Sequence, residues 1–203
     1  MSTPAPSRTP LTTYLVIASC VATFFLLQAR DPQATIGAAL WPLGHGFEPW
    51  QLFSHAFLHG NLTHLLFNML GLFVFGAPIE RAVGARAFTV LYFVSVLTAA
   101  ITQLAFNAWT GTDIPSVGAS GGLFGLMLMF ALLFPRAKMI LLILPIPIPA
   151  PLFVTLYAAA ELWMGVTGTQ QGVGHFAHLG GLLGGGLVWL YWRAGYERSK
   201  RRD

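Results

Sequence analysis

Six long apolar runs constrain the fold of this chain more than any other feature of its sequence. A helix needs about 20 apolar residues to cross the roughly 30 Å hydrocarbon core of a bilayer. Only 9% of the 203 residues are charged, whereas a soluble domain has roughly 25%. The sequence therefore predicts an all-α membrane protein, a bundle of six transmembrane helices. The predicted helices cover residues 11–28, 62–79, 87–109, 117–134, 152–167 and 174–192.

The remaining segments predict a single domain with two short tails. Residues 1–10 contain three prolines and little apolar surface, which predicts a disordered N-terminal tail. Residues 11–193 form the predicted six-helix domain, and residues 194–203 form a basic C-terminal tail. Prolines alternate through residues 145–151, which favours an extended connection at the membrane interface over a seventh span. Because Cys20 is the only cysteine, a disulfide framework is excluded.

The lysine and arginine residues predict the orientation of the bundle. With both termini cytoplasmic, ten of the eleven basic residues lie on the cytoplasmic side and only Arg30 lies outside. This is the bias that the positive-inside rule describes. The basic residues are spread over short loops and one tail, so no nucleic-acid partner is expected. No small-residue cleavage site follows residues 11–28, which indicates a membrane helix. We expect a multi-pass protein of a bacterial plasma (inner) membrane.

Three chemically distinctive residues begin three of the predicted helices. His64, Ser120 and His178 each lie near the start of a helix that enters the membrane from the external side. They are therefore expected at a similar depth, just below the outer surface, although they are far apart in the sequence. A serine hydroxyl needs a base to become a good nucleophile, and histidine suits that role near neutral pH.

Glycines on two helices predict that Ser120 and His178 come into contact. His178, Gly181 and Gly185 share one helix face at positions i, i+3 and i+7. The spacing of the two glycines lets another membrane helix approach closely. The helix that carries the serine offers a matching surface of small residues: Gly118, Gly121, Gly122 and Gly125. Close contact between these helices would bring the histidine within hydrogen-bond distance of the serine.

A second pair of polar residues is suited to stabilise a negative charge. His64 and Asn68 lie four residues apart on one helix, so their side chains share a face. Acyl transfer needs hydrogen-bond donors for the developing oxyanion. These two side chains and the backbone N–H of Ser120 form the predicted oxyanion hole.

The combined motifs resemble those of the rhomboid family of intramembrane serine proteases. The resemblance extends over residues 11–192. At two positions the chain differs from many relatives: Phe124 replaces a tyrosine that stacks on the histidine, and Gln51 replaces an arginine after Trp50. The matching motifs are His55-Ala-Phe-Leu-His59, His64-Leu-Leu-Phe-Asn68, Glu80-Arg81, Gly118-Ala-Ser120-Gly121, and Ala177-His178 with Gly181 and Gly185.

The resemblance implies a site and a reaction. Ser120 would be the nucleophile and His178 its base, a dyad without a required carboxylate. His64 and Asn68 would donate to the oxyanion, and Gly118 would line the same hole. The supporting residues would be Phe124, Gly121, Gly181 and Gly185. The reaction would need no cofactor and no metal.

The resemblance also implies the partners of the protein, which are membrane lipids and transmembrane protein substrates. A substrate helix would enter between the second and fifth helices. It would be cut near the external membrane face through an acyl-enzyme. The oligomeric state is not predicted.

Several alternatives compete with this interpretation. The chain could be a catalytically inactive relative that binds transmembrane helices, and Ser120 could be only a small packing residue. A transporter using the histidines is a third hypothesis, which the apolar inner halves of the helices disfavour. His55, His59 and His64 could instead bind zinc.

Two further polar residues have no assigned reaction. Glu161, inside an apolar run, is expected to pair with a neighbour or to line a wet cavity. His175 is expected at the membrane interface without a chemical role.

Overall fold

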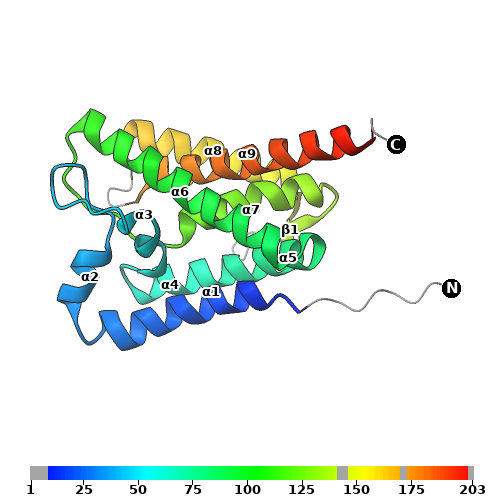
Figure 1. The fold of residues 1–203 in the computed structure, drawn as a ribbon. Coiled ribbons are helices and arrows are strands. Elements are labelled where there is room, and N and C mark those ends of the chain that lie inside the picture. Colours follow the sequence, from blue (N-terminus) through cyan, green and yellow to red (C-terminus); the bar gives the residue numbers. More distant parts are fainter. Residues whose placement is uncertain (1–8, 141–145, 170–172, 201–203) are drawn as a thin grey trace.

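The computed structural model describes residues 9–140, 146–169 and 173–200, and most of this part of the chain is helical (Figure 1). The predicted N-terminal tail, residues 1–10, therefore lies almost entirely outside the described residues. Residues 194–200 of the predicted basic tail are helical and exposed, because the last helix, α9 (His175–Lys200), continues through them.

Four helices in the described part of the chain are long and apolar enough to cross a membrane. The first is α1 (Leu11–Ala22) with a π-helical continuation (Thr23–Gln28). The second joins α4 (Leu62–Gly71), a π-helical segment (Leu72–Gly76) and α5 (Ala77–Val83). The others are α6 (Ala85–Thr110) and α8 (Ala150–Thr167). These four agree with four of the six predicted spans, so this chain is an integral membrane protein.

The two remaining predicted spans differ in kind. The fourth, α7 (Ser120–Leu133), has 14 residues and is shorter than the predicted 117–134. At 1.5 Å per residue it is about 21 Å long, which is less than the hydrocarbon thickness of a bilayer. The sixth, α9, contains three residues of the predicted site, His178, Gly181 and Gly185. Helix α7 is apolar but shorter than the four other helices. Helix α9 has 26 residues and is long enough, but it is less apolar than they are.

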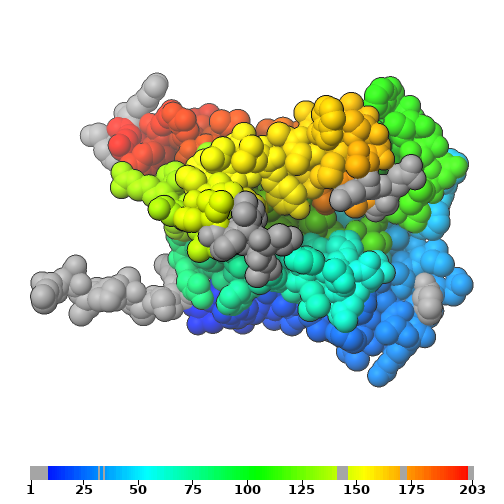
Figure 2. Space-filling model, turned by 180° about the vertical axis from the view of Figure 1, so that it is seen from behind, coloured from blue at the N-terminus to red at the C-terminus, as the bar shows by residue number. Residues whose placement is uncertain are grey.

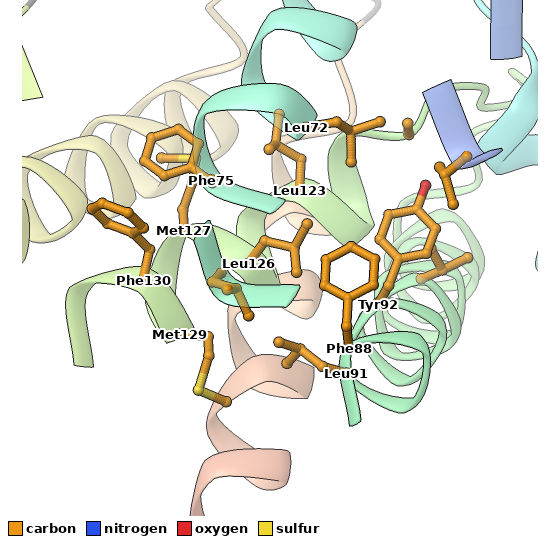
Figure 3. Close-up of a cluster of buried hydrophobic side chains, with 14 of the residues drawn as sticks. Leu72, Phe75, Phe88, Leu91, Tyr92, Leu123, Leu126, Met127, Met129 and Phe130 are labelled. Carbon is orange, nitrogen blue, oxygen red and sulfur yellow. The ribbon is translucent and has the colours of Figure 1, made fainter. Parts of the chain in front are cut away.

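Helix α7 lies in the middle of the bundle, between the 62–83 segment on one side and α6 and α9 on the other (Figure 1). Most of its residues are buried, as expected for a helix that is apolar on every side. Figure 3 shows apolar side chains from 62–83, α6 and α7 pointing toward one another. The labelled residues are Leu72, Phe75, Phe88, Leu91, Tyr92, Leu123, Leu126, Met127, Met129 and Phe130. This interlocking of large side chains holds α7 in place.

Helices α7 and α9 meet at glycines, as the sequence predicts. A Cβ atom on Gly181 would overlap the carbonyl oxygen of Gly121. A Cβ atom on Gly185 would lie 2.6 Å from the carbonyl oxygen of Gly125. Since real Cβ atoms do not approach so closely, only glycine permits this backbone contact.

A buried carboxylate attaches α1 to α5. Glu80 accepts hydrogen bonds from the backbone N–H of Thr12 at 2.9 Å and of Thr13 at 2.7 Å. It also accepts a hydrogen bond from the Thr13 hydroxyl at 2.7 Å. The first amides of a helix have no partner within it, and a negative charge at this end is favourable. Glu80 therefore caps α1 and has a structural explanation.

The segment after α1 folds over one end of the bundle. It contains α2 (Pro32–Ala38), α3 (Gln51–Ser54) and a 3₁₀ turn (His55–Phe57). Gln51, 1% exposed, bonds three backbone groups: it accepts from Trp41 N–H at 3.1 Å and donates to the carbonyls of Gly37 and Gly46 at 3.2 Å. The glutamine that replaces the family's arginine therefore helps to anchor this segment, together with Ser54, whose hydroxyl donates to the carbonyl of Ala38 at 2.7 Å.

Two short strands lie in the described parts of the segment that follows α7. Strand β1 (Lys138–Ile140) pairs antiparallel with β2 (Pro147–Pro149), and Met139 lies opposite Ile148. Residues 141–145 of the predicted interfacial connection lie outside the described residues. β2 leads directly into α8.

The helices alternate in direction, so their ends collect at two faces of the bundle. The start of α1 and the end of α9 lie together on the right in Figure 1, and α2 and α3 lie at the opposite end. The starts of α4, α7 and α9 all lie at the end that carries α2 and α3. Figure 2 shows α8 and α4 flanking the other face of the molecule. Both helices expose large apolar side chains, including Phe67 on α4 and Leu156 on α8.

Candidate active site

Ser120 is the first residue of α7, and a glycine sets where that helix begins. Gly118 has φ +132°, a conformation that residues with a side chain rarely adopt. Its N–H donates to the carbonyl of His55 at 2.9 Å. The predicted helix start at residue 117 is therefore wrong, because the chain bends at Gly118 to meet the 3₁₀ turn. This bend places Ser120 and its backbone N–H at an open helix N-terminus.

The segment ahead of α7 is held by the long segment that follows α1. Leu40 and Ser116 exchange two backbone hydrogen bonds, of 3.0 and 2.9 Å. His55 in turn donates from Nδ1 to the carbonyl of Gln51 at 2.7 Å. Through these bonds the anchored segment 51–57 determines the position of the serine.

Ser120 and His178 lie within hydrogen-bond distance, as the glycine spacing predicts. His178 Nε2 is 2.8 Å from Ser120 Oγ. The His178 ring stacks on Phe124, with ring centroids 4.3 Å apart and planes inclined by 8°. Phenylalanine therefore supplies the stacking that tyrosine supplies in many relatives. The imidazole is held by this ring on one face, with its Nε2 directed at the hydroxyl.

The other nitrogen of His178 faces a carboxylate. His178 Nδ1 is 2.9 Å from Glu161 Oε2, an ion-pair distance, without the alignment of a hydrogen bond. The same oxygen is 2.6 Å from His175 Nδ1. His175 Nε2 lies 3.1 Å from the carbonyl oxygen of Thr169. All three ionisable side chains are buried, with exposed fractions of 2% for Glu161, 6% for His175 and 9% for His178.

His64 lies beside the bend at Gly118. A Cβ atom on Gly118 would be 2.8 Å from His64 Nε2 and 3.6 Å from Ser120 Oγ. Asn61 caps α4, because its Oδ1 accepts the backbone N–H of His64 at 2.8 Å. The structure thus brings His64, Gly118 and Ser120 to one place.

Asn68 is buried one helical turn after His64. Its Nδ2 donates to the carbonyl of His64 at 2.9 Å, and its Oδ1 has no partner among the described residues. An amide carries two N–H groups, so one remains for a ligand. The structure shows Asn68 on the helix that carries His64, without a direct bond to Ser120.

His55 and His59 belong to the 51–60 segment, and the His59 ring centroid lies 5.1 Å from that of His64 on α4. Burial lowers the pKa of His55 from 6.5 to about 4. Burial and the nearby His64 lower the pKa of His59 to about 4. Within the described part of the chain, the ligand atoms that converge belong to Glu161, His175 and His178. The alternative of a zinc site at His55, His59 and His64 thus has no support here.

Two residues of this arrangement were assigned no reaction from the sequence. Glu161 pairs with neighbours, as expected, but with both histidines of α9. His175, for which no chemical role was expected, is buried and lies against Glu161. The sequence did contain one indication of a role for Glu161. Acidic residues are rare in membrane helices, and Glu161 and Glu80 are the ones within the predicted apolar runs or at their ends. Since Glu80 caps a helix, Glu161 is the one left without a structural explanation.

Comparison with known proteins gives a consistent result. A model of the Rhomboid domain family matches residues 46–194, which is most of the chain. Rhomboid protein 1, mitochondrial, of Saccharomyces cerevisiae is 35% identical over 152 residues, 72% of this chain and 43% of the relative. Rhomboid protease GlpG of Klebsiella pneumoniae is 32% identical over 118 residues, 57% of this chain and 41% of the relative. Rhomboid protease GluP of Bacillus subtilis is 30% identical over 184 residues, 87% of this chain and 34% of the relative.

The chain thus spans less than half the length of each of these relatives. The match to the family covers α4 and α6 to α9, the helices that carry Ser120, His178, His64 and Asn68. It also covers the anchored segment 51–57 that positions the serine. On this evidence, the chain belongs to the rhomboid family.

Proposed function

We propose that this protein is an intramembrane serine endopeptidase that cuts transmembrane segments of other membrane proteins. The observation that carries this proposal is the 2.8 Å contact between Ser120 Oγ and His178 Nε2, in a chain related to proteins named rhomboid proteases. A serine and a histidine at this distance have the geometry of a nucleophile and its base. The stacked Phe124 keeps the base oriented.

The reaction follows from this geometry. His178 Nε2 accepts the hydroxyl proton while Ser120 Oγ attacks the carbonyl carbon of the scissile peptide bond. The negative oxygen that forms is stabilised by the Ser120 N–H, with His64 and Asn68 as side-chain donors. His178 then gives the proton to the leaving amine as the C–N bond breaks. Water, activated by the same histidine, hydrolyses the acyl-enzyme.

We propose that six helices cross the membrane with both termini cytoplasmic. This orientation places the basic residues that follow α5, α7 and α9 on the cytoplasmic side. With its far end at the cytoplasmic interface, α7 would begin about 9 Å below the external one, since it is about 21 Å long in a core of about 30 Å. Cleavage would then occur within the membrane, near the external face.

We propose that the substrate helix enters between α4 and α8. Both present exposed apolar side chains, such as Leu66 and Phe67 on α4 and Leu152 and Leu156 on α8. An intact helix hides its carbonyl groups in its own hydrogen bonds, so the substrate must unwind locally to be cut. Residues that destabilise a helix are therefore expected to favour cleavage. The membrane we propose is the plasma membrane of a bacterium.

A catalytically inactive protein that binds transmembrane helices is the alternative. The alignment of Ser120, His178 and Phe124 argues against it, because a binding protein has no need of an oriented base.

A serine-directed fluorophosphonate tests the proposal, because it reacts with activated serines and spares unactivated ones. The purified protein in detergent should be labelled at Ser120 alone, as located by mass spectrometry. His178→Ala should abolish the labelling, while the exposed His45→Ala should not. Equal labelling of wild type and His178→Ala would overturn the proposed role of His178.

A further inference from the structure

A single carboxylate oxygen lies against both histidines of α9. Glu161 Oε2 is 2.6 Å from His175 Nδ1 and 2.9 Å from His178 Nδ1. The three groups come from two helices, α8 and α9, and are buried. Burial of an unpaired carboxylate in a low-dielectric environment is costly, so this charge requires a partner or a proton.

The contacts of His175 constrain where its protons are. Its Nε2 faces the carbonyl of Thr169 at 3.1 Å, and a carbonyl can only accept. Nε2 therefore carries a proton. Its Nδ1 faces Glu161 at 2.6 Å, so a proton must also lie between these two atoms. A His175 cation paired with a Glu161 anion satisfies this count, as does a neutral ring facing a protonated carboxyl. Because the same carboxylate oxygen also faces His178 Nδ1, we infer the anion.

The contacts of His178 impose the complementary condition. Its Nε2 must carry a lone pair to accept the proton of Ser120 Oγ, 2.8 Å away. The proton of the neutral ring is then on Nδ1, which faces Glu161 Oε2. A carboxylate at this position favours that tautomer and stabilises the cation that forms when Nε2 takes the serine proton.

We propose that Glu161 is a positioning residue for the base His178, and that His175 holds Glu161 in place. This inference rests on the proposed function and extends the Ser120–His178 pair to a third group, which the family resemblance does not require. During acylation the serine proton moves to His178 Nε2, and the proton on Nδ1 stays on that nitrogen. Glu161 remains an anion throughout, so its role is electrostatic and orienting.

The same three side chains have the composition of a His₂Glu metal site. Their spacing favours the proton arrangement. Two ligands bound tetrahedrally at about 2.0–2.1 Å from one zinc ion lie roughly 3.3–3.4 Å apart. The observed separations of 2.6 and 2.9 Å are shorter than that, and they are distances of polar groups in direct contact. The experiments below separate the two arrangements.

Variants of Glu161 provide the first test, in the full-length protein with a cleavable model transmembrane substrate. Glu161→Gln should lower kcat by roughly 10- to 10,000-fold, with KM changed by less than about twofold. Glu161→Asp should recover part of the loss, because it restores the charge. The matched control is Glu197→Gln, an exposed glutamate paired with Arg193 on α9, which should cut at the wild-type rate. A folded Glu161→Gln protein that retains wild-type kcat would overturn the proposal.

A spectroscopic measurement tests the proposal even where a variant does not fold. ¹⁵N-labelled histidine in the wild-type protein distinguishes N–H from lone-pair nitrogens. His178 should carry its proton on Nδ1, and His175 should be protonated on both nitrogens. The opposite tautomer of His178 would contradict the proposal. So would loss of cleavage in a metal chelator with recovery on adding Zn²⁺, because the trio would then be a metal site.

These outcomes are distinct from failure of the proposed function. If the wild-type protein cuts no substrate and its serine does not react with fluorophosphonate, the protease proposal fails as a whole. If the wild type cuts and Glu161→Gln cuts equally well, only the role of Glu161 fails.

Discussion

Asn68 provides a test of the oxyanion hole at the scale of one side chain. Its Nδ2 holds one bond to the carbonyl of His64, and its second N–H is available for the substrate oxygen. Asn68→Ala should lower kcat by about 10- to 1,000-fold, the usual range for the loss of one oxyanion donor. Steady-state cleavage kinetics measure the effect.

The matched control for this prediction is Val90→Ala, an exposed position on α6, outside the proposed substrate entrance. It should leave kcat unchanged. If both variants behave alike, Asn68 has no special part in the reaction.

The buried imidazole of His55 should make the stability of the folded protein depend on pH. Burial lowers its pKa from 6.5 to about 4, so the unfolded chain binds a proton between these values that the folded protein does not. Stability should therefore be complete above about pH 6.5 and should decrease as the pH falls toward 4. A shift of this size corresponds to about 3 kcal/mol. The free energy of unfolding in detergent, measured across this range, gives the slope.

His55→Gln removes the titrating group and should flatten this dependence by about that amount. His59, whose pKa is also lowered to about 4, keeps its own contribution in the variant. Identical pH profiles for wild type and His55→Gln would show that His55 is accessible to protons in the folded protein.

At this scale, sequence reasoning depends on spacing within a helix. The face shared by His178, Gly181 and Gly185 predicted the contact with Ser120, because the 3.6-residue period is a local property. The approach of Glu161 to His178 depends on how α8 packs on α9, which no spacing in the sequence reports. For this reason the sequence analysis assigned no chemical role to Glu161 or His175.

At the scale of elements, the contact of α7 with α9 is the interface that holds the serine against the histidine. Gly181→Ala should destabilise the protein by roughly 1–3 kcal/mol, because the added Cβ has no space against the Gly121 carbonyl. The Ser120–His178 distance should increase as the helices separate, so the cleavage rate should fall too. Thermal unfolding in detergent measures the first effect.

Gly186→Ala is the matched control on the same helix. A Cβ atom there would meet only Leu128 Cδ2 at 3.6 Å, an ordinary contact. This variant should be as stable as wild type or up to about 1 kcal/mol more stable, since alanine favours helix over glycine. Equal losses from both substitutions would mean that glycine packing is not what holds α7 to α9.

The boundaries of elements were predictable where hydrophobicity alone decides them. Residues 11–28 are helical as predicted, and residues 147–149 of the proline-rich connection are extended, whereas Ala150 and Pro151 already belong to α8. The start of α7 was placed three residues early, because Gly118 lies in an apolar stretch but takes φ +132° to bond His55. The short helices at 32–38 and 51–54 were missed, because tertiary bonds such as those of Gln51 hold them.

At the scale of the whole molecule, the bundle has a centre and a periphery. Helix α7 is surrounded, while α1 and α8 expose most of their apolar side chains. Four of the six predicted spans have the length and apolarity of membrane helices. The sequence did not predict the difference in burial, because a buried helix and a lipid-facing one have the same composition.

Cleavage of a model transmembrane substrate tests the central claim most directly. Wild type, Ser120→Ala and His178→Ala are purified in detergent and compared on the same substrate, with mass spectrometry locating the cut. The account predicts a cut within the transmembrane segment, near its external end, by the wild type alone. Cleavage by Ser120→Ala at the wild-type rate would contradict it.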